Sequence, residues 1–193
     1  MSEWDYFPGE DREQHWIQER LETLSVRESV ALTAAVLRNQ PQNAVDAINL
    51  LQSLDHYTVH INAGNYEALG HAWLRNETKM PQSAMPFVDL EQAGRYYEDH
   101  HPGLFVGDCY VEYPKKDPQP VYEGQGSPLP EDTDWSVKLK IASDAVTEGV
   151  WLRLPGWESC GDESSADEEL ALRELKARNW SDCILLDAQC ILP

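Results

Sequence analysis

The segment 114–134 separates two different hydrophobic patterns. It contains five prolines and two glycines and few apolar residues. Proline lacks the backbone N–H that helices and central strands require, so this composition predicts a linker or a long surface loop. Apolar residues recur at helical spacing before the segment and alternate with polar ones after it. We therefore expect an α+β protein, with a mainly helical α/β part over residues 1–113 and a small β-β-α-β unit over residues 135–193.

Three amphipathic helices are predicted in the first quarter of the chain. Residues 11–24 place apolar side chains at helical spacing. The second helix begins after Ser25, because Ser25 and Glu28 form a capping-box signature. Asn43 is the predicted N-cap of the third helix, which ends at about Leu54.

The middle of the chain mixes short strands and helices. Residues 57–61 predict a strand and residues 66–74 a helix. A further helix is expected to begin at Asp89 and to run through Tyr97. Residues 104–113 are rich in strand formers and predict another strand.

The end of the chain follows a different order. Residues 135–141 alternate apolar and polar side chains, which predicts a half-buried strand. A turn at 148–149 leads to a second strand over 150–154. Residues 165–178 predict a helix, with acids in its first turn and bases in its last, and residues 183–186 predict a third strand.

The charge balance narrows the classes of function. The chain has 34 Asp and Glu residues against 15 Lys and Arg residues, a formal net charge of -19. Such a chain repels nucleic acid and acidic membranes and attracts basic proteins. Duplex DNA has about one charge per 1.7 Å of axis, so nineteen charges match roughly 32 Å of duplex. The charge is sufficient for a mimic of DNA, and ordinary acidic solubility is the alternative explanation.

Other features argue against several classes of protein. No apolar run approaches the roughly 20 residues that span a bilayer, and the acidic N-terminus differs from a secretory signal, so a cytoplasmic protein is expected. No known catalytic or phosphate-binding motif occurs, which predicts a protein that is not an enzyme and has no cofactor; a hydrolase with an unfamiliar motif is the alternative. The cysteines are widely spaced and read as reduced core thiols: Cys109, Cys160, Cys183 and Cys190.

Histidine and tryptophan residues suggest no further ligand. His100 and His101 follow two acids, but neighbouring side chains on a helix point in different directions, so a helix end before Pro102 is the simpler interpretation and no metal is expected. His56 and His60 have no nearby third ligand and remain unassigned. Most of the seven tryptophans are interpreted as core residues, with a dimer contact as the alternative for one or two, because the negative charge opposes stacking with nucleic-acid bases.

Several short segments between residues 43 and 113 have a recognisable order and spacing. They are Asp46–Leu50, Leu54–Tyr57, Leu69–Gly70, Asp89–Arg95 and Gly103–Val111. This order resembles the later part of the ArdA antirestriction proteins, over about seventy residues. The segment GVWLRLP at 149–155, with the acidic helix and strand after it, is similar to the opening domain of that family. The chain is therefore predicted to be a divergent member with a rearranged domain order.

The resemblance implies a function by competition rather than by catalysis. ArdA-like proteins resemble B-form DNA in charge, occupy the DNA groove of type I restriction-modification complexes, generally act as homodimers, and occur on conjugative plasmids and transposons. The expected partner is thus a DNA-binding restriction-modification or other defence enzyme, whose Lys and Arg residues pair with carboxylates in place of phosphates. The alternative is an acidic interaction module of a mobile genetic element that binds another basic protein.

Acidic clusters supply the candidate partner-binding residues. Within the matched region, the predicted phosphate-mimicking acids are Asp89, Glu91, Glu98, Asp99, Asp108 and Glu112. A solvated helix face, in which Arg95 pairs with Glu91 or Glu98, is the alternative. The secondary cluster, for which helix capping and solubility are the alternative, is Glu158, Asp162, Glu163, Asp167, Glu168 and Glu169. A third group is interpreted as a solvated face: Asp5, Glu10, Asp11, Glu13, Glu19 and Glu22.

Overall fold

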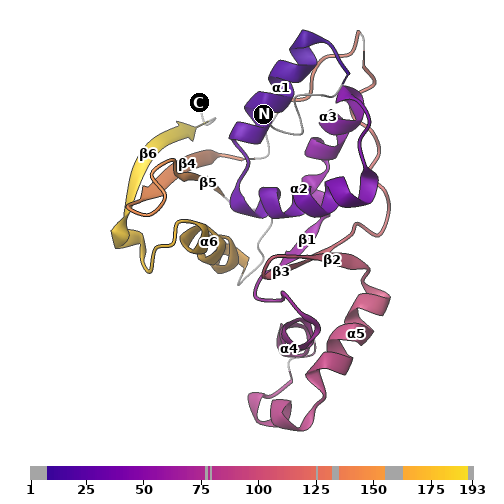
Figure 1. The fold of residues 1–193 in the computed structure, drawn as a ribbon, viewed down its shortest axis with the longest axis vertical. Coiled ribbons are helices and arrows are strands. Elements are labelled where there is room, and N and C mark those ends of the chain that lie inside the picture. The colour runs from indigo at the N-terminus through magenta and orange to yellow at the C-terminus, as the bar shows by residue number, and fades with distance from the viewer. Residues whose placement is uncertain are drawn as a thin grey trace. The chain divides into compact units, whose positions relative to one another are not determined.

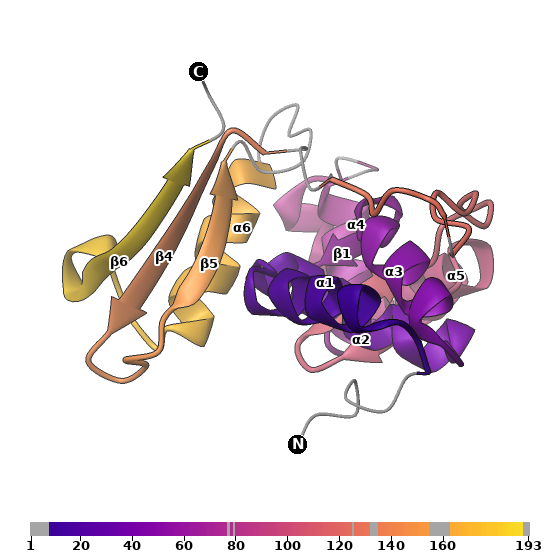
Figure 2. The same cartoon turned by 90° about the horizontal axis from the view of Figure 1, so that it is seen from above.

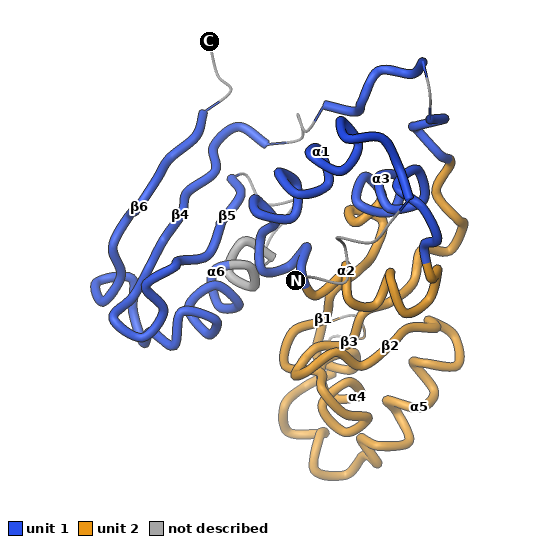
Figure 3. Tube along the Cα trace, turned by 45° about the horizontal axis from the view of Figure 1, so that its top comes forward, with its two compact units in different colours: residues 1–29, 41–52, 120–193 blue, residues 30–40, 53–119 orange. Residues whose placement is uncertain are grey.

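The computed structural model describes residues 8–76, 78, 80–124, 126–131, 135–154 and 163–190. The chain forms two compact units, which Figure 3 shows in different colours. Unit 1 comprises residues 1–29, 41–52 and 120–193, and unit 2 comprises residues 30–40 and 53–119. Each unit combines helices with a three-stranded antiparallel sheet, so the predicted α+β class is confirmed.

The predicted helices at the start of the chain are present (Figure 1): α1 (Asp11–Glu22), α2 (Val26–Asn39) and α3 (Ala44–Gln52). The predicted caps are confirmed as well. Ser25 N donates to Glu28 Oε2 over 2.7 Å, and Glu28 N donates to Ser25 Oγ over 3.3 Å. Asp46 N donates to Asn43 Oδ1 over 2.9 Å. These side chains bind backbone N–H groups that have no partner within the first turn of a helix.

The end of unit 1 has the predicted β-β-α-β order: β4 (Val137–Ser143), β5 (Val150–Leu154), α6 (Glu163–Glu174) and β6 (Cys183–Cys190). The strands pair in the order β5-β4-β6. Ala171 and Leu175 pack against Ile141 and Leu152, which places α6 against one face of the sheet (Figure 2). Strand β6 continues to Cys190, four residues beyond its predicted end, because it pairs with the full length of β4.

Unit 2 contains β1 (Thr58–His60), α4 (Tyr66–Asn76), α5 (Leu90–His100), β2 (Gly103–Val106) and β3 (Cys109–Glu112), with short 3-10 helices at Leu54–His56 and Gln82–Phe87. The strands pair in the order β1-β3-β2. The single strand predicted over 104–113 is instead the hairpin β2–β3. Gly107 lies in the turn with φ of 56°, a left-handed conformation that glycine adopts without a steric cost.

Helices α4 and α5 pack closely through two glycines. A Cβ atom added to Gly70 would collide with the carbonyl oxygen of Leu90, and one added to Gly94 would collide with that of Tyr66. The neighbouring core of unit 2 contains Leu69 and Tyr97. Because glycine has no side chain, these two positions allow the backbones of α4 and α5 to approach this closely.

The sequence predicts a linker or a long surface loop over 114–134. The described residues of this segment form no helix or strand, yet Tyr122 is buried and donates from its hydroxyl to Glu13 Oε1 over 2.8 Å. The side-chain oxygen of Asn49 accepts from the backbone N–H groups of Val121 and Tyr122. Unit 1 contains α1 and α3 together with the sheet near the C-terminus. Its bounds therefore differ from those of the predicted domains, 1–113 and 135–193. No helix in the described part of the chain has the length and apolar character to cross a membrane.

Candidate functional site

Several of the predicted phosphate-mimicking acids have local partners on α5. Asp89 is the N-cap, and its side chain accepts from Gln92 N over 3.0 Å. Glu91 pairs with Arg95 one turn later, at 2.8 Å between Glu91 Oε1 and Arg95 Nη2. Glu98 accepts from the hydroxyl of Tyr66 over 2.9 Å. Helix α5 therefore contains the ion pair between Glu91 and Arg95 that the alternative interpretation, a solvated helix face, includes.

The remaining acids of this set differ in exposure. Asp99 and Asp108 are exposed, but Glu112 on β3 is only 12% exposed. In the described part of unit 2, seven acidic residues and five basic residues are exposed. The unit that contains this predicted site therefore has a nearly balanced surface charge.

Glu112 is the centre of a partly buried polar network. Its Oε2 accepts from the hydroxyl of Tyr97 over 2.9 Å and lies 3.5 Å from His60 Nε2, and its Oε1 lies 3.0 Å from His101 Nδ1. Burial raises the pKa of Glu112, but hydrogen bonds from His60, His101 and Tyr97 outweigh burial and lower the pKa to about 2. A carboxylate with these three partners stabilises unit 2. The partner-binding role of Glu112 stays a prediction.

The secondary acidic cluster is only partly described. Glu158 and Asp162 lie outside the described residues, and Glu163 and Asp167 lie on α6 with side chains outside the description. Glu168 and Glu169 are exposed, and Glu169 Oε1 lies 3.4 Å from Arg173 Nη2. These two acids lie at the surface of unit 1.

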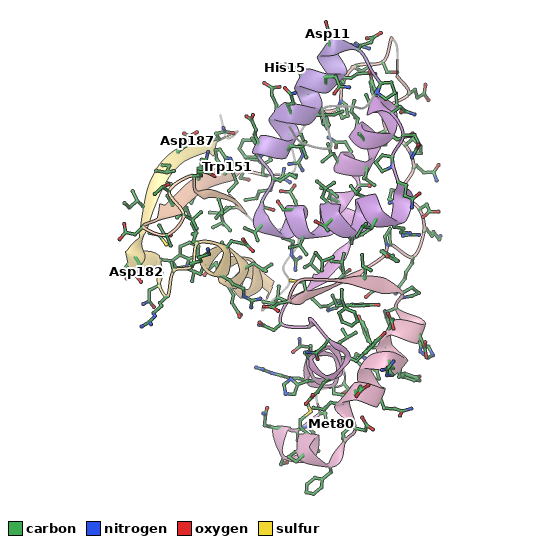
Figure 4. All side chains as sticks on the ribbon, viewed as in Figure 1. Asp11, His15, Met80, Trp151, Asp182 and Asp187 are labelled. Carbon is green, nitrogen blue, oxygen red and sulfur yellow. The ribbon has the colours of Figure 1, made fainter. Side chains whose placement is uncertain are left out.

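Unit 1 has a strongly acidic surface. By sequence it contains 24 of the 34 acidic residues and 9 of the 15 Lys and Arg residues. Among its described residues, 13 acids are exposed but only 3 bases, which are Arg12, Lys176 and Arg178. The acids are Asp11, Glu19, Glu22, Asp46, Glu123, Glu131, Asp144, Glu148, Glu168, Glu169, Glu174, Asp182 and Asp187. Figure 4 labels Asp11 on α1 and Asp182 and Asp187 at β6.

The third acidic group, at the start of the chain, contains both exposed and buried residues. Asp11, Glu19 and Glu22 are exposed, as a solvated face requires. Glu13 is buried, and its Oε2 accepts from the backbone N–H of Glu10 over 2.7 Å. Asp5 lies outside the described residues.

In the described part of unit 1, more basic than acidic residues are buried. Arg20, Lys138 and Arg153 are 6%, 2% and 5% exposed, whereas the buried acids of the described part of the unit are Glu13 and Glu28. Glu28 Oε1 accepts from Arg20 Nη2 and also from Arg153 Nη1, which lies 2.5 Å away. One carboxylate thus pairs with two guanidinium groups from α1 and β5. Because these cations are buried, the ratio of acidic to basic residues is higher at the described surface of unit 1 than in its sequence.

Metal coordination finds no support in the described part of the chain, where no group of three or more His, Cys, Asp or Glu residues could hold an ion. His100 Nδ1 bonds to the backbone oxygen of Tyr96 at 2.8 Å, as expected for a histidine at the end of a helix. Cys109, Cys183 and Cys190 are free thiols, of which Cys109 is buried and Cys190 is exposed. The prediction of buried core thiols is therefore wrong for Cys190, and Cys160 lies outside the described residues.

Comparisons with known proteins yield no relative of this chain: no protein-family model, no curated protein and no solved structure matches it.

Proposed function

We propose that this protein is an antirestriction-type DNA mimic, which inhibits a DNA-binding restriction-modification or other defence enzyme by competing with DNA. The observation that supports this proposal best is the ratio of 13 exposed acids to 3 exposed bases in the described part of unit 1. A surface of this kind attracts a DNA channel lined by Lys and Arg residues. Unit 1 is accordingly the main binding surface in this proposal.

The buried cations strengthen this surface. Arg20 and Arg153 share Glu28 in the interior, so neither guanidinium lies at the surface among the exposed acids. Lys138 is 2% exposed. Exposed carboxylates at such a surface can form short ion pairs with the partner's basic side chains.

Competition with labelled duplex DNA tests the proposal. A purified type I methyltransferase bound to a fluorescent duplex should release the duplex when the protein is added at low salt. Inhibition should weaken by orders of magnitude as salt rises from about 50 to about 200 mM, because each basic contact of the partner contributes to the salt dependence. No displacement at low ionic strength would falsify the proposal. Binding that duplex DNA does not compete with would favour the alternative, an acidic interaction module.

Two matched triple variants locate the binding surface. Asp144→Asn, Glu148→Gln and Asp182→Asn remove three exposed charges from unit 1. The control removes three exposed charges from unit 2, with the substitutions Asp55→Asn, Glu67→Gln and Asp99→Asn. The unit 1 variant should inhibit at least tenfold less strongly than the control at low salt. Equal inhibition by the two variants would remove unit 1 as the main surface.

A further inference from the structure

Strand β6 forms one edge of the sheet in unit 1, where β4 is its only partner among the described strands (Figure 2). It is eight residues long, and every residue from Ile184 to Cys190 is exposed. The backbone N–H and C=O groups on the open side of an edge strand can pair with a further strand. The long, exposed edge of β6 is therefore a candidate interaction surface.

The exposed apolar side chains of β6 indicate the shape of its partner. Ile184, Leu185 and Leu186 are 61%, 58% and 50% exposed. Ile184 and Leu185 lie opposite consecutive residues of β4, and consecutive side chains of a strand point to opposite faces of the sheet. A helix or a pocket placed on one face covers only one of these two side chains. A strand added at the edge flanks both faces and can cover both.

The charges along this edge indicate the composition of the partner. Asp187 is exposed within β6, and Asp182 is exposed just before its first residue (Figure 4). The three exposed bases of the described part of unit 1 lie outside its strands. Lys140, opposite Asp187 on β4, is half-buried, and its ammonium lies 5.8 Å from the centre of the Trp151 ring. Charge complementarity therefore favours a partner segment that contains Lys or Arg.

A second copy of the chain does not have this composition. Its β6 would supply apolar side chains but no Lys or Arg, because the strand contains no basic residue. Each chain has a formal net charge of -19, so two copies repel each other. Like charges that face each other across two strands also destabilise the pairing. The expected occupant is therefore a different protein.

We propose that β6 binds an extended, apolar segment of a partner protein that contains Lys or Arg, as a fourth strand of the unit 1 sheet. Main-chain hydrogen bonds to β6 hold the segment, its apolar side chains cover Ile184 and Leu185, and its cation pairs with Asp187. This contact goes beyond the mimicry of DNA, because the open edge of a strand recognises a polypeptide backbone.

The probe is a capped fluorescent peptide that matches β6 in length and contains valine, threonine and lysine. It should bind the full chain and slow the hydrogen exchange of backbone N–H groups in β6, but not in β2 of unit 2. One control peptide has glutamate in place of lysine, and the other has N-methyl groups on its backbone nitrogens. Each control should bind at least tenfold more weakly. Equal binding of the N-methylated peptide, which keeps the positive charge, would overturn the proposal, as would no binding of the probe at millimolar concentration.

A matched pair of variants tests the apolar contact. Ile184→Thr combined with Leu185→Thr keeps both positions exposed and polar in a residue type that suits strands, and should weaken binding at least tenfold. Val121→Thr changes an exposed apolar residue of the same unit outside the sheet, and should leave binding unchanged. Unchanged affinity in the folded double variant would overturn the proposal.

A second pair tests the charge. Asp187→Asn removes the charge but keeps a side-chain oxygen for the Ala188 backbone N–H, from which Asp187 accepts over 2.8 Å. The preference for the lysine peptide over the glutamate peptide should fall at least threefold. Glu174→Gln, at an exposed acid of α6, should keep the preference of the original protein. An undiminished preference in Asp187→Asn would overturn the assignment of a basic partner to this edge.

Discussion

Glu28 on α2 and Arg153 on β5 are separated by 125 residues, yet Glu28 Oε1 and Arg153 Nη1 lie 2.5 Å apart. The same oxygen accepts from Arg20 of α1. The second oxygen, Oε2, accepts from the backbone N–H of Ser25 over 2.7 Å and completes the cap of α2. One carboxylate therefore connects a helix cap, a second helix and the sheet of unit 1.

Replacement of Glu28 by Gln should strongly destabilise unit 1. The substitution keeps the size of the side chain but leaves two buried guanidinium groups without their shared carboxylate. Removing one partner of a buried ion pair costs about 3–5 kcal/mol. Urea unfolding at neutral pH measures the loss. The control is Glu22→Gln on α1, an exposed position where a change within about 0.5 kcal/mol is expected. A loss no larger than that of the control would contradict the assigned role of Glu28.

Tyr122→Phe should loosen the proline-rich segment. The substitution removes the hydroxyl that donates to the buried carboxylate of Glu13, so a loss of about 1–2 kcal/mol is expected. Limited proteolysis should cleave within 114–134 faster in the variant than in the original protein. Tyr96→Phe changes an exposed tyrosine and serves as the control. Identical cleavage rates in all three proteins would show that the hydroxyl does not hold this segment.

Local elements were largely predictable from the sequence, because their causes lie within a few residues. Ser25 and Glu28 cap α2 through a spacing of three, and Asp89 starts α5 in the same local way. The sequence predicts one strand where the hairpin β2–β3 lies, because Gly107 interrupts a run that is otherwise rich in strand formers. Its positive φ marks the turn.

Non-local contacts were not predictable from periodicity. Lys138 occupies a polar position of an alternating strand, so the pattern predicts solvent exposure, yet α1 covers that face and the residue is buried. Glu112 contacts His60, which is 52 residues earlier in the chain. The net charge was known from composition, but the concentration of exposed acids on unit 1 depends on which bases the fold buries. The ArdA-like resemblance stays a prediction.

Acid should selectively weaken the Glu112 network of unit 2. The pKa of Glu112 falls from 4.5 to about 2 on folding, because the hydrogen bonds from His60, His101 and Tyr97 favour the carboxylate. A lowered pKa contributes stability that is fully present above about pH 4.5 and is lost as the pH falls towards 2. The contribution is about 3 kcal/mol. Unfolding measured from pH 6 to pH 2 should therefore show a shallower loss in Glu112→Gln than in the original protein. Parallel pH profiles would show that this carboxylate contributes nothing to acid sensitivity.

Gly94→Ala tests two opposing effects in one helix. In the interior of an isolated helix, alanine is more favourable than glycine by about 1 kcal/mol, which predicts stabilisation. In α5 the added methyl group would collide with the backbone oxygen of Tyr66, an atom that moves only if α4 moves. Overpacking of this kind typically costs about 1–3 kcal/mol, and more against backbone.

The collision should therefore outweigh the helix preference and give a net loss of about 1–2 kcal/mol in urea unfolding. Gly107→Asn is the matched control, because an added Cβ there meets no atom within 4 Å and asparagine tolerates a φ of 56°. Stability of the control should change by less than about 0.5 kcal/mol. A more stable Gly94→Ala protein would show that α4 and α5 can move apart without a loss of stability. That result would contradict the role assigned to the contact between the two glycines.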